Sequence, residues 1–91
     1  MLHIVKSLTA LNELVALHKD GDQVLLIEDA VYACNAQHPI FPILKELKVC
    51  VLIADLQARG IQNRVSPSCR QITYADFVDL TVEQNNSLTW N

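Results

Sequence analysis

Three cysteines are the residues of this sequence with the clearest capacity for covalent chemistry: Cys34, Cys50 and Cys69. They are widely spaced, and none belongs to a Cys-x-x-Cys pair. A zinc site needs ligands in close pairs, and a disulfide framework needs an even number of cysteines in a secreted chain. The spacing therefore predicts three reduced thiols and no metal site.

The surroundings of each thiol predict little activation. A nucleophilic cysteine needs a lowered thiol pKa, which a helix N-terminus or a nearby cation provides. Cys50 lies between two valines and is expected to be a buried structural residue. Cys69 neighbours Arg70 but has no visible base. Cys34 is the best placed for chemistry, because it follows a predicted strand, although it lies near the end of a short helix rather than at its start.

The remaining polar residues predict no second centre. The three histidines are far apart in the sequence: His3, His18 and His38. None has the i, i+4 spacing by which two histidines on one helix share a metal. Asp29 and Asp55 each follow a predicted strand, and we interpret both as helix N-caps. With only two glycines, the chain has neither a dinucleotide fingerprint nor a phosphate-binding loop, so no cofactor is expected.

Composition sets limits on the class of protein. A chain of 91 residues is expected to form one domain, residues 1–91. A hydrophobic share of 51% excludes disorder, and no apolar run approaches the length of a membrane span. Lys6 interrupts the first apolar stretch too early for a signal peptide, which favours a cytoplasmic protein. The net charge of −3, without a basic cluster, argues against direct nucleic-acid binding.

The hydrophobic pattern predicts an α/β domain with a mainly parallel sheet of four to five strands. Continuous apolar runs are typical of parallel strands that are covered on both faces. The strands are expected at 2–6, 23–28, 48–54 and 71–74, and a fifth edge strand fits 88–90. Short helices are expected at 29–33, 42–47 and 55–59. Alternation of strands and helices favours βαβ units.

Polar signals place the ends of the two longer helices. Thr9 is the expected N-cap of the first helix and Gly21 its expected C-cap. Thr73 and Asp76 have the spacing of a capping box. The helix after Thr73 is expected to carry one face made of Tyr74, Phe77, Val78 and Thr81. Trp90 must either fold back onto the domain or dock on a partner, and both interpretations are open.

Four segments carry a resemblance to a known family: MLH leading to Lys6 and Ser7, LIEDAVYA at 26–33, DLQARG at 55–60, and YADFVDLT at 74–81 with Trp90 beyond it. Together they resemble the TusB/DsrH family over essentially the whole chain. The resemblance implies a small flavodoxin-like fold of three layers. It also implies a subunit of a TusB–TusC–TusD complex, a dimer of heterotrimers. That complex relays persulfide sulfur from a TusA-type carrier to TusE for 2-thiolation of wobble uridine in tRNA.

Two cysteines of the family are missing at the matching positions. The sulfur-carrying cysteine belongs to the TusD-type subunit after the third strand, where this sequence has Leu52–Asp55. DsrH members often carry a cysteine in the first helix, but Leu11–His18 contains none. The resemblance therefore implies a non-catalytic subunit of the TusB type, with TusC-like and TusD-like partners and a TusE-like acceptor. The residues predicted to contact partners are Tyr32, Asp55, Arg59 and Trp90.

Two alternatives remain beside this interpretation. The chain could be a persulfide carrier in its own right, with Cys34 as the nucleophile. It could also be a homo-oligomeric module that binds a small ligand at the strand ends. Self-association is a natural outcome for so small a domain, since a short chain buries only a modest share of its surface on folding.

Overall fold

The computed structural model describes residues 1–84 and 86–91 and has a single sheet of five parallel strands. The strands are β1 (Leu2–Val5), β2 (Gln23–Leu26), β3 (Lys48–Leu52), β4 (Arg70–Ile72) and β5 (Ser87–Trp90). Their order across the sheet is β4-β3-β2-β1-β5, and every neighbouring pair is parallel. The predicted α/β class, the four strands and the fifth edge strand are thereby confirmed.

The strands end earlier than the hydrophobic runs that predicted them. The run at 48–54 stops being a strand at Leu52, because Ile53 begins the helix α2 (Ile53–Ala58). The run at 23–28 ends at Leu26, and a 3₁₀ helix, η1 (Glu28–Cys34), starts two residues later. Apolar residues continue past both strand ends, so hydrophobicity alone places the boundaries too late.

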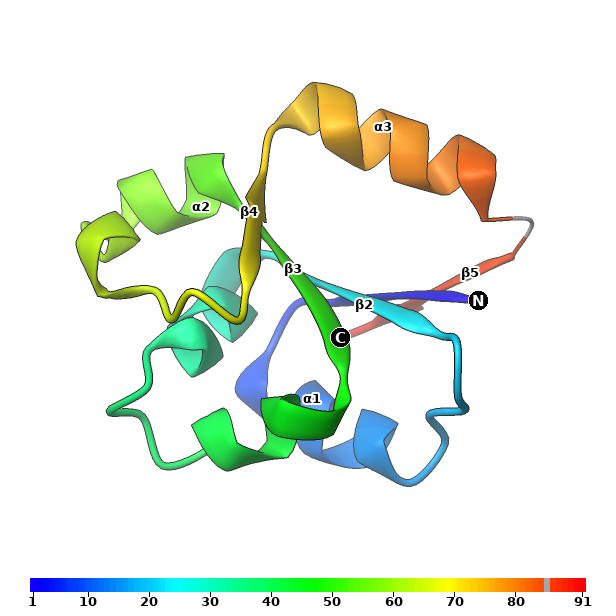
Figure 1. Cartoon of the computed structure of the whole chain (residues 1–91), viewed down its shortest axis with the longest axis horizontal. Coiled ribbons are helices and arrows are strands. Elements are labelled where there is room, and N and C mark those ends of the chain that lie inside the picture. Colours follow the sequence, from blue (N-terminus) through cyan, green and yellow to red (C-terminus); the bar gives the residue numbers. More distant parts are fainter. Residues whose placement is uncertain (85) are drawn as a thin grey trace.

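Helices cover both faces of the sheet and produce three layers (Figure 1). One face is covered by α1 (Leu8–Val15), η1 and the 3₁₀ helix η2 (Phe41–Glu46), and the other by α3 (Tyr74–Glu83). From β1 to β4 the chain moves in one direction across the sheet, and from β4 to β5 it returns to the far side of β1. Because parallel crossovers are right-handed, this reversal places α3 on the opposite face.

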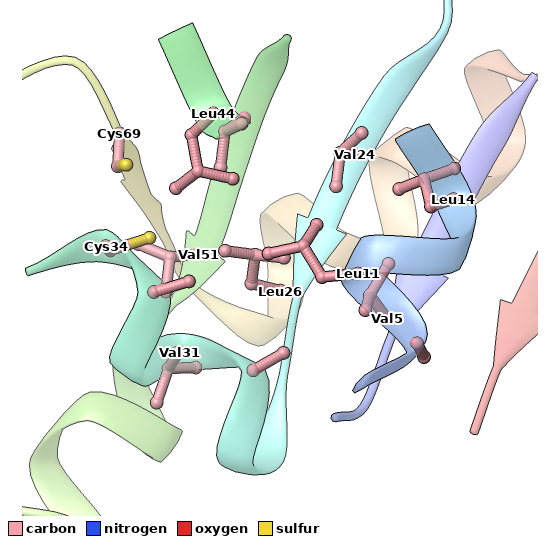
Figure 2. Packing of buried hydrophobic residues seen from close by; sticks show 14 of the residues in the cluster. Val5, Leu11, Leu14, Val24, Leu26, Val31, Cys34, Leu44, Val51 and Cys69 are labelled. Atoms are coloured by element: carbon pink, nitrogen blue, oxygen red, sulfur yellow. The ribbon is translucent and has the colours of Figure 1, made fainter. Parts of the chain in front are cut away.

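The core on the α1 side is the larger of the two. Figure 2 shows its side chains converging from α1, β1, β2, η1 and β3. Leu11, Leu14, Leu26 and Val51 are fully buried there. Alternate residues of β3 face opposite ways, so Val49 and Val51 enter this core whereas Cys50 faces α3.

Several predicted helix ends are wrong. The N-cap of α1 is Ser7, whose hydroxyl accepts a hydrogen bond from the backbone N–H of Ala10 at 3.1 Å, because the helix already includes Thr9. The helix ends at Val15, so Gly21 is not its C-cap. Gly21 has a φ of +89° and belongs to the turn that leads into β2. Its freedom from a Cβ suits this left-handed conformation.

The start of α3 agrees with the prediction, but its buried face does not. The Thr73 hydroxyl accepts from the Asp76 N–H at 3.2 Å, and the Asp76 carboxylate accepts from the Thr73 N–H at 3.1 Å. This is the predicted capping box. The expected single face divides, however, because Phe77 packs on the sheet with Leu80 while Tyr74 and Val78 point outward, each 61% exposed. The helix is therefore rotated relative to the expectation.

Candidate functional site

An ionic group around Arg59 lies at the carboxyl end of the sheet, where parallel folds place their ligand sites. The Arg59 guanidinium donates to Oδ1 of Asp29 from two nitrogens, over 3.2 and 3.1 Å. It also lies 3.7 Å from the carboxylate of Asp55. Asp55 in turn accepts a hydrogen bond from the backbone N–H of Glu28 at 2.8 Å. These contacts fasten η1 to α2.

This geometry corrects the interpretation of both aspartates as caps of their own helices. The N-cap position of η1 is Ile27 and that of α2 is Leu52, and neither makes a side-chain capping bond. Asp29 instead pairs with Arg59, and Asp55 serves the first turn of the neighbouring η1. The reason is the close packing of η1 on α2, which offers each carboxylate a partner from the other element.

Glu28 has an unusual backbone at this point. Its φ is +50°, a left-handed value that costs energy for a residue with a side chain. The bond from its N–H to Asp55 helps to hold this conformation, and its carboxylate lies 3.8 Å from the Lys6 ammonium. The acidic groups here all have cationic partners, so the arrangement suits recognition better than proton transfer.

The four predicted contact residues fall into two separate places. Tyr32 on η1 is 36% exposed. It shares that element with Asp29, so it lies in the same part of the molecule as Asp55 and Arg59. Trp90 is elsewhere, on the edge strand β5. Three of the four candidates therefore lie in one region of the molecule, and Trp90 lies in another.

Trp90 folds back onto the domain. Its indole N–H donates to Nδ1 of His3 at 3.1 Å, and Nε2 of His3 lies 2.9 Å from the carboxylate of Asp22. Because Nδ1 accepts, Nε2 must carry the hydrogen and donate to Asp22. Asp22 also binds the N-terminal ammonium at 3.2 Å. The bond from His3 holds the pKa of the Asp22 carboxyl well below its usual range.

A small, mainly apolar cavity of about 180 Å³ adjoins this chain of hydrogen bonds. Its wall includes Leu17, Leu88 and Trp90. The rings of His3 and His18 lie near each other, with centroids 6.5 Å apart. Nε2 of His18 is buried and has no hydrogen-bond partner among the described residues. In the described part of the chain, no group of three or more histidine, cysteine or acidic side chains is arranged to hold a metal ion.

The thiols are all free and buried. Cys34 is fully buried, and the pKa of its thiol is raised, first by a hydrogen bond with Cys69 and then by desolvation. That same bond lowers the pKa of the Cys69 thiol. Desolvation raises the pKa of the Cys50 thiol. Cys34, the alternative nucleophile, is therefore the less activated member of a thiol pair.

The outer surface of α3 presents an apolar stripe. Tyr74, Val78 and Val82 are spaced four residues apart and are 61%, 61% and 77% exposed. Such spacing puts the three side chains on one side of the helix. Three carboxylates lie on the same helix: Asp76, Asp79 and Glu83. These carboxylates line a depression with Arg70 and Leu80, away from the stripe. A water-exposed apolar stripe is typical of a protein contact surface.

Residues 6–87 match the family of DsrH-like proteins. The chain belongs to the TusB/DsrH family. It is 36% identical to Protein TusB of Escherichia coli O81 (strain ED1a) and to Protein TusB of Escherichia fergusonii. Each alignment covers 98% of this chain and 96% of the relative. The predicted resemblance is confirmed.

The fold of the TusB/DsrH chain also has a close counterpart among solved structures. A crystal structure of the ychN protein from E. coli superposes with a TM-score of 0.73 at 19% sequence identity, and the match covers 97% of each chain. At this identity the likeness concerns the fold alone. No helix within residues 1–84 and 86–91 is long and apolar enough to cross a membrane.

Three side-chain contacts of this family member were not predicted from the sequence. They are the bond between Trp90 and His3, the ion pair between Arg59 and Asp29, and the contact between Cys34 and Cys69. Each joins residues far apart in the chain, and no local pattern marks any of them. The contact between Trp90 and His3 follows from the strand order, which places β5 beside β1. The sequence did not predict that order.

Proposed function

We propose that this chain is a non-catalytic subunit of a sulfur-relay complex of the TusB–TusC–TusD type. The complex would support 2-thiolation of wobble uridine in tRNA in the cytoplasm. Family membership supports the relay, and the buried thiols support a subunit that does not carry the sulfur itself. The whole chain, 1–91, would act as one domain.

The observation that carries the proposal is the exposed stripe of Tyr74, Val78 and Val82 on α3. In water these side chains leave apolar surface unburied, and burying it against a sister subunit would be favourable. The helix α3 packs Phe77 and Leu80 on the sheet, whereas the stripe lies outside both core clusters. Its outer side is better suited to assembly than to folding.

A second contact region would be the ionic group at the strand ends. Tyr32, Asp55 and Arg59 remain our candidates there, and Trp90 is a candidate at the edge strand. TusC-like and TusD-like chains are the proposed direct partners, and a TusE-like acceptor would meet the complex. The net charge of −3 supports a role without direct contact to tRNA.

Co-expression with the TusC-like and TusD-like proteins of the same source tests the proposal. We expect a stable complex containing two copies of each chain by native mass spectrometry. Val78→Asp is expected to abolish co-purification, because it puts a charge in the apolar stripe. Val15→Asp is the matched control, since Val15 is a half-exposed valine on α1 in the opposite layer.

The outcomes separate the proposal from its rivals. Recovery of this chain alone, as a self-complex with an occupied pocket, would support the ligand-binding module. A persulfide found on Cys34 after incubation with a persulfide donor would support a self-sufficient carrier. Loss of partners with Val15→Asp but not with Val78→Asp would contradict the docking role of α3.

A further inference from the structure

Two cysteines of this chain meet across a tertiary contact. Cys34 is the last residue of η1, and Cys69 directly precedes β4. The backbone holds the two segments together: the N–H of Ser66 donates to the carbonyl of Cys34 at 2.8 Å, and Asn35 forms an antiparallel bridge with Val65. A turn bond of 3.0 Å from the Cys69 N–H to the Ser66 carbonyl brings Cys69 back toward η1.

The sulfur atoms lie in the same part of the larger core. Figure 2 shows both in the space between η1 and the segment that leads into β4. Each thiol acts on the pKa of the other: the pKa of Cys34 is raised and that of Cys69 is lowered. Thiol exchange requires a thiolate, and a lowered pKa favours that form, so we expect Cys69 to be the attacking group. Cys50 faces the opposite side of the sheet and belongs to the other core.

We propose that Cys34 and Cys69 form a redox-active dithiol that closes to an intramolecular disulfide by exchange with a small-molecule disulfide. The thiolate of Cys69 attacks one sulfur of the small disulfide, whose S–S bond breaks and releases a thiolate. The sulfur of Cys34 then attacks Sγ of Cys69 and displaces the small thiolate that is bound there. The proton of Cys34 passes to the thiolate released in the first step. Two protein thiols are oxidised, and one small disulfide is reduced to two thiols.

Burial sets the rate of this reaction. Cys69 is 4% exposed, so an incoming disulfide reaches it only when the turn at 66–69 opens. We therefore expect closure in minutes to hours, the ordinary scale of uncatalysed disulfide exchange. The closed bond would tie η1, which carries Asp29 and Tyr32, to the start of β4. Oxidation would thus fix the strand-end region in place.

The inference is tested on the purified full chain in glutathione buffers of graded ratio. Samples are quenched by alkylation and examined by mass spectrometry with peptide mapping. We expect oxidising buffer to remove two hydrogen atoms and to link the peptides of Cys34 and Cys69. The Tm is expected to rise by about 10 °C and to return on reduction, because the bond closes a long loop.

Cys50→Ala is the matched control and is expected to oxidise like the parent chain. Cys34→Ala and Cys69→Ala are expected to lose the reaction. If either variant fails to fold, the peptide map of the parent chain decides. No link in the folded chain under oxidising buffer, a link that includes Cys50, or a link that forms only in denaturant would overturn the inference.

Discussion

The indole N–H of Trp90 donates a hydrogen bond to Nδ1 of His3 over 3.1 Å and so joins the edge strand β5 to β1. The two strands are also paired in parallel, with Leu88 opposite His3. His3 is 2% exposed, so its ring nitrogens need protein partners. Trp90 supplies one of them and Asp22 the other. Trp90, for which the sequence left two interpretations open, therefore packs as part of the fold.

Trp90→Phe is expected to lower the free energy of unfolding by about 1 kcal/mol, because it removes the N–H donor and keeps most of the ring. Trp90→Ala is expected to cost about 3 kcal/mol or more, since it also removes the packing of the ring. Chemical denaturation followed by circular dichroism measures both. Equal losses for the two variants would show that the hydrogen bond, rather than packing, is what Trp90 contributes.

Acid is expected to weaken the same region through Asp22. The hydrogen bond from His3 lowers the pKa of this carboxyl in the folded chain, so the ionised form contributes stability above its unfolded pKa of about 4. That contribution is lost as pH falls from there toward the folded pKa. Asp22→Asn is expected to cost about 1 kcal/mol at pH 7 and progressively less below pH 4. A loss that stays constant from pH 7 to pH 2 would contradict this account.

The sheet was predictable because its strands carry a strong signal. The runs at 23–28 and 48–54 are apolar without alternation, which indicates burial on both faces and hence parallel pairing with helices on each side. Their ends were not predictable, because Ile53 continues the run and yet begins α2. Helix periodicity predicted an apolar face on α3 but did not predict which side of the helix packs on the sheet. Only the position of Leu80 and Phe77 over the sheet settles that.

Some residues of the candidate site were predictable from the sequence, but their ion-pair and hydrogen-bond partners were not. The DLQARG segment drew attention to Asp55 and Arg59, and both lie at the strand ends. Their partners Asp29 and Glu28 come from the preceding crossover, so the ion pairs depend on the packing of η1 on α2. Local preference for aspartate at helix starts suggested capping instead. A tertiary partner overrode that preference.

Arg59→Ala is expected to leave the isolated chain within about 1 kcal/mol of the parent, because its ion pairs are partly exposed to solvent. In the presence of TusC-like and TusD-like partners we expect weaker assembly, seen as a higher dissociation constant by sedimentation. Arg64→Ala is the control, since Arg64 is an exposed arginine outside the ionic group. If both variants weaken assembly equally, the lost positive charge explains the effect, and Arg59 is not a specific contact residue.

The capping box gives a final prediction about α3, the helix proposed to meet the partner. Thr73→Ala is expected to lower the free energy of unfolding by about 1 kcal/mol, because it leaves the Asp76 N–H without its acceptor. The bond from the Thr73 N–H lowers the pKa of Asp76, and Thr73→Ala is expected to loosen that first turn. Thr81→Ala is the control, since its hydroxyl donates to the carbonyl of Val78 within the helix, and a change within about 0.5 kcal/mol is expected. Hydrogen exchange is expected to show a frayed helix start in Thr73→Ala and not in Thr81→Ala. If Thr73→Ala alone also binds the partners more weakly, the cap is needed to present the stripe; equal binding by both variants would contradict that link.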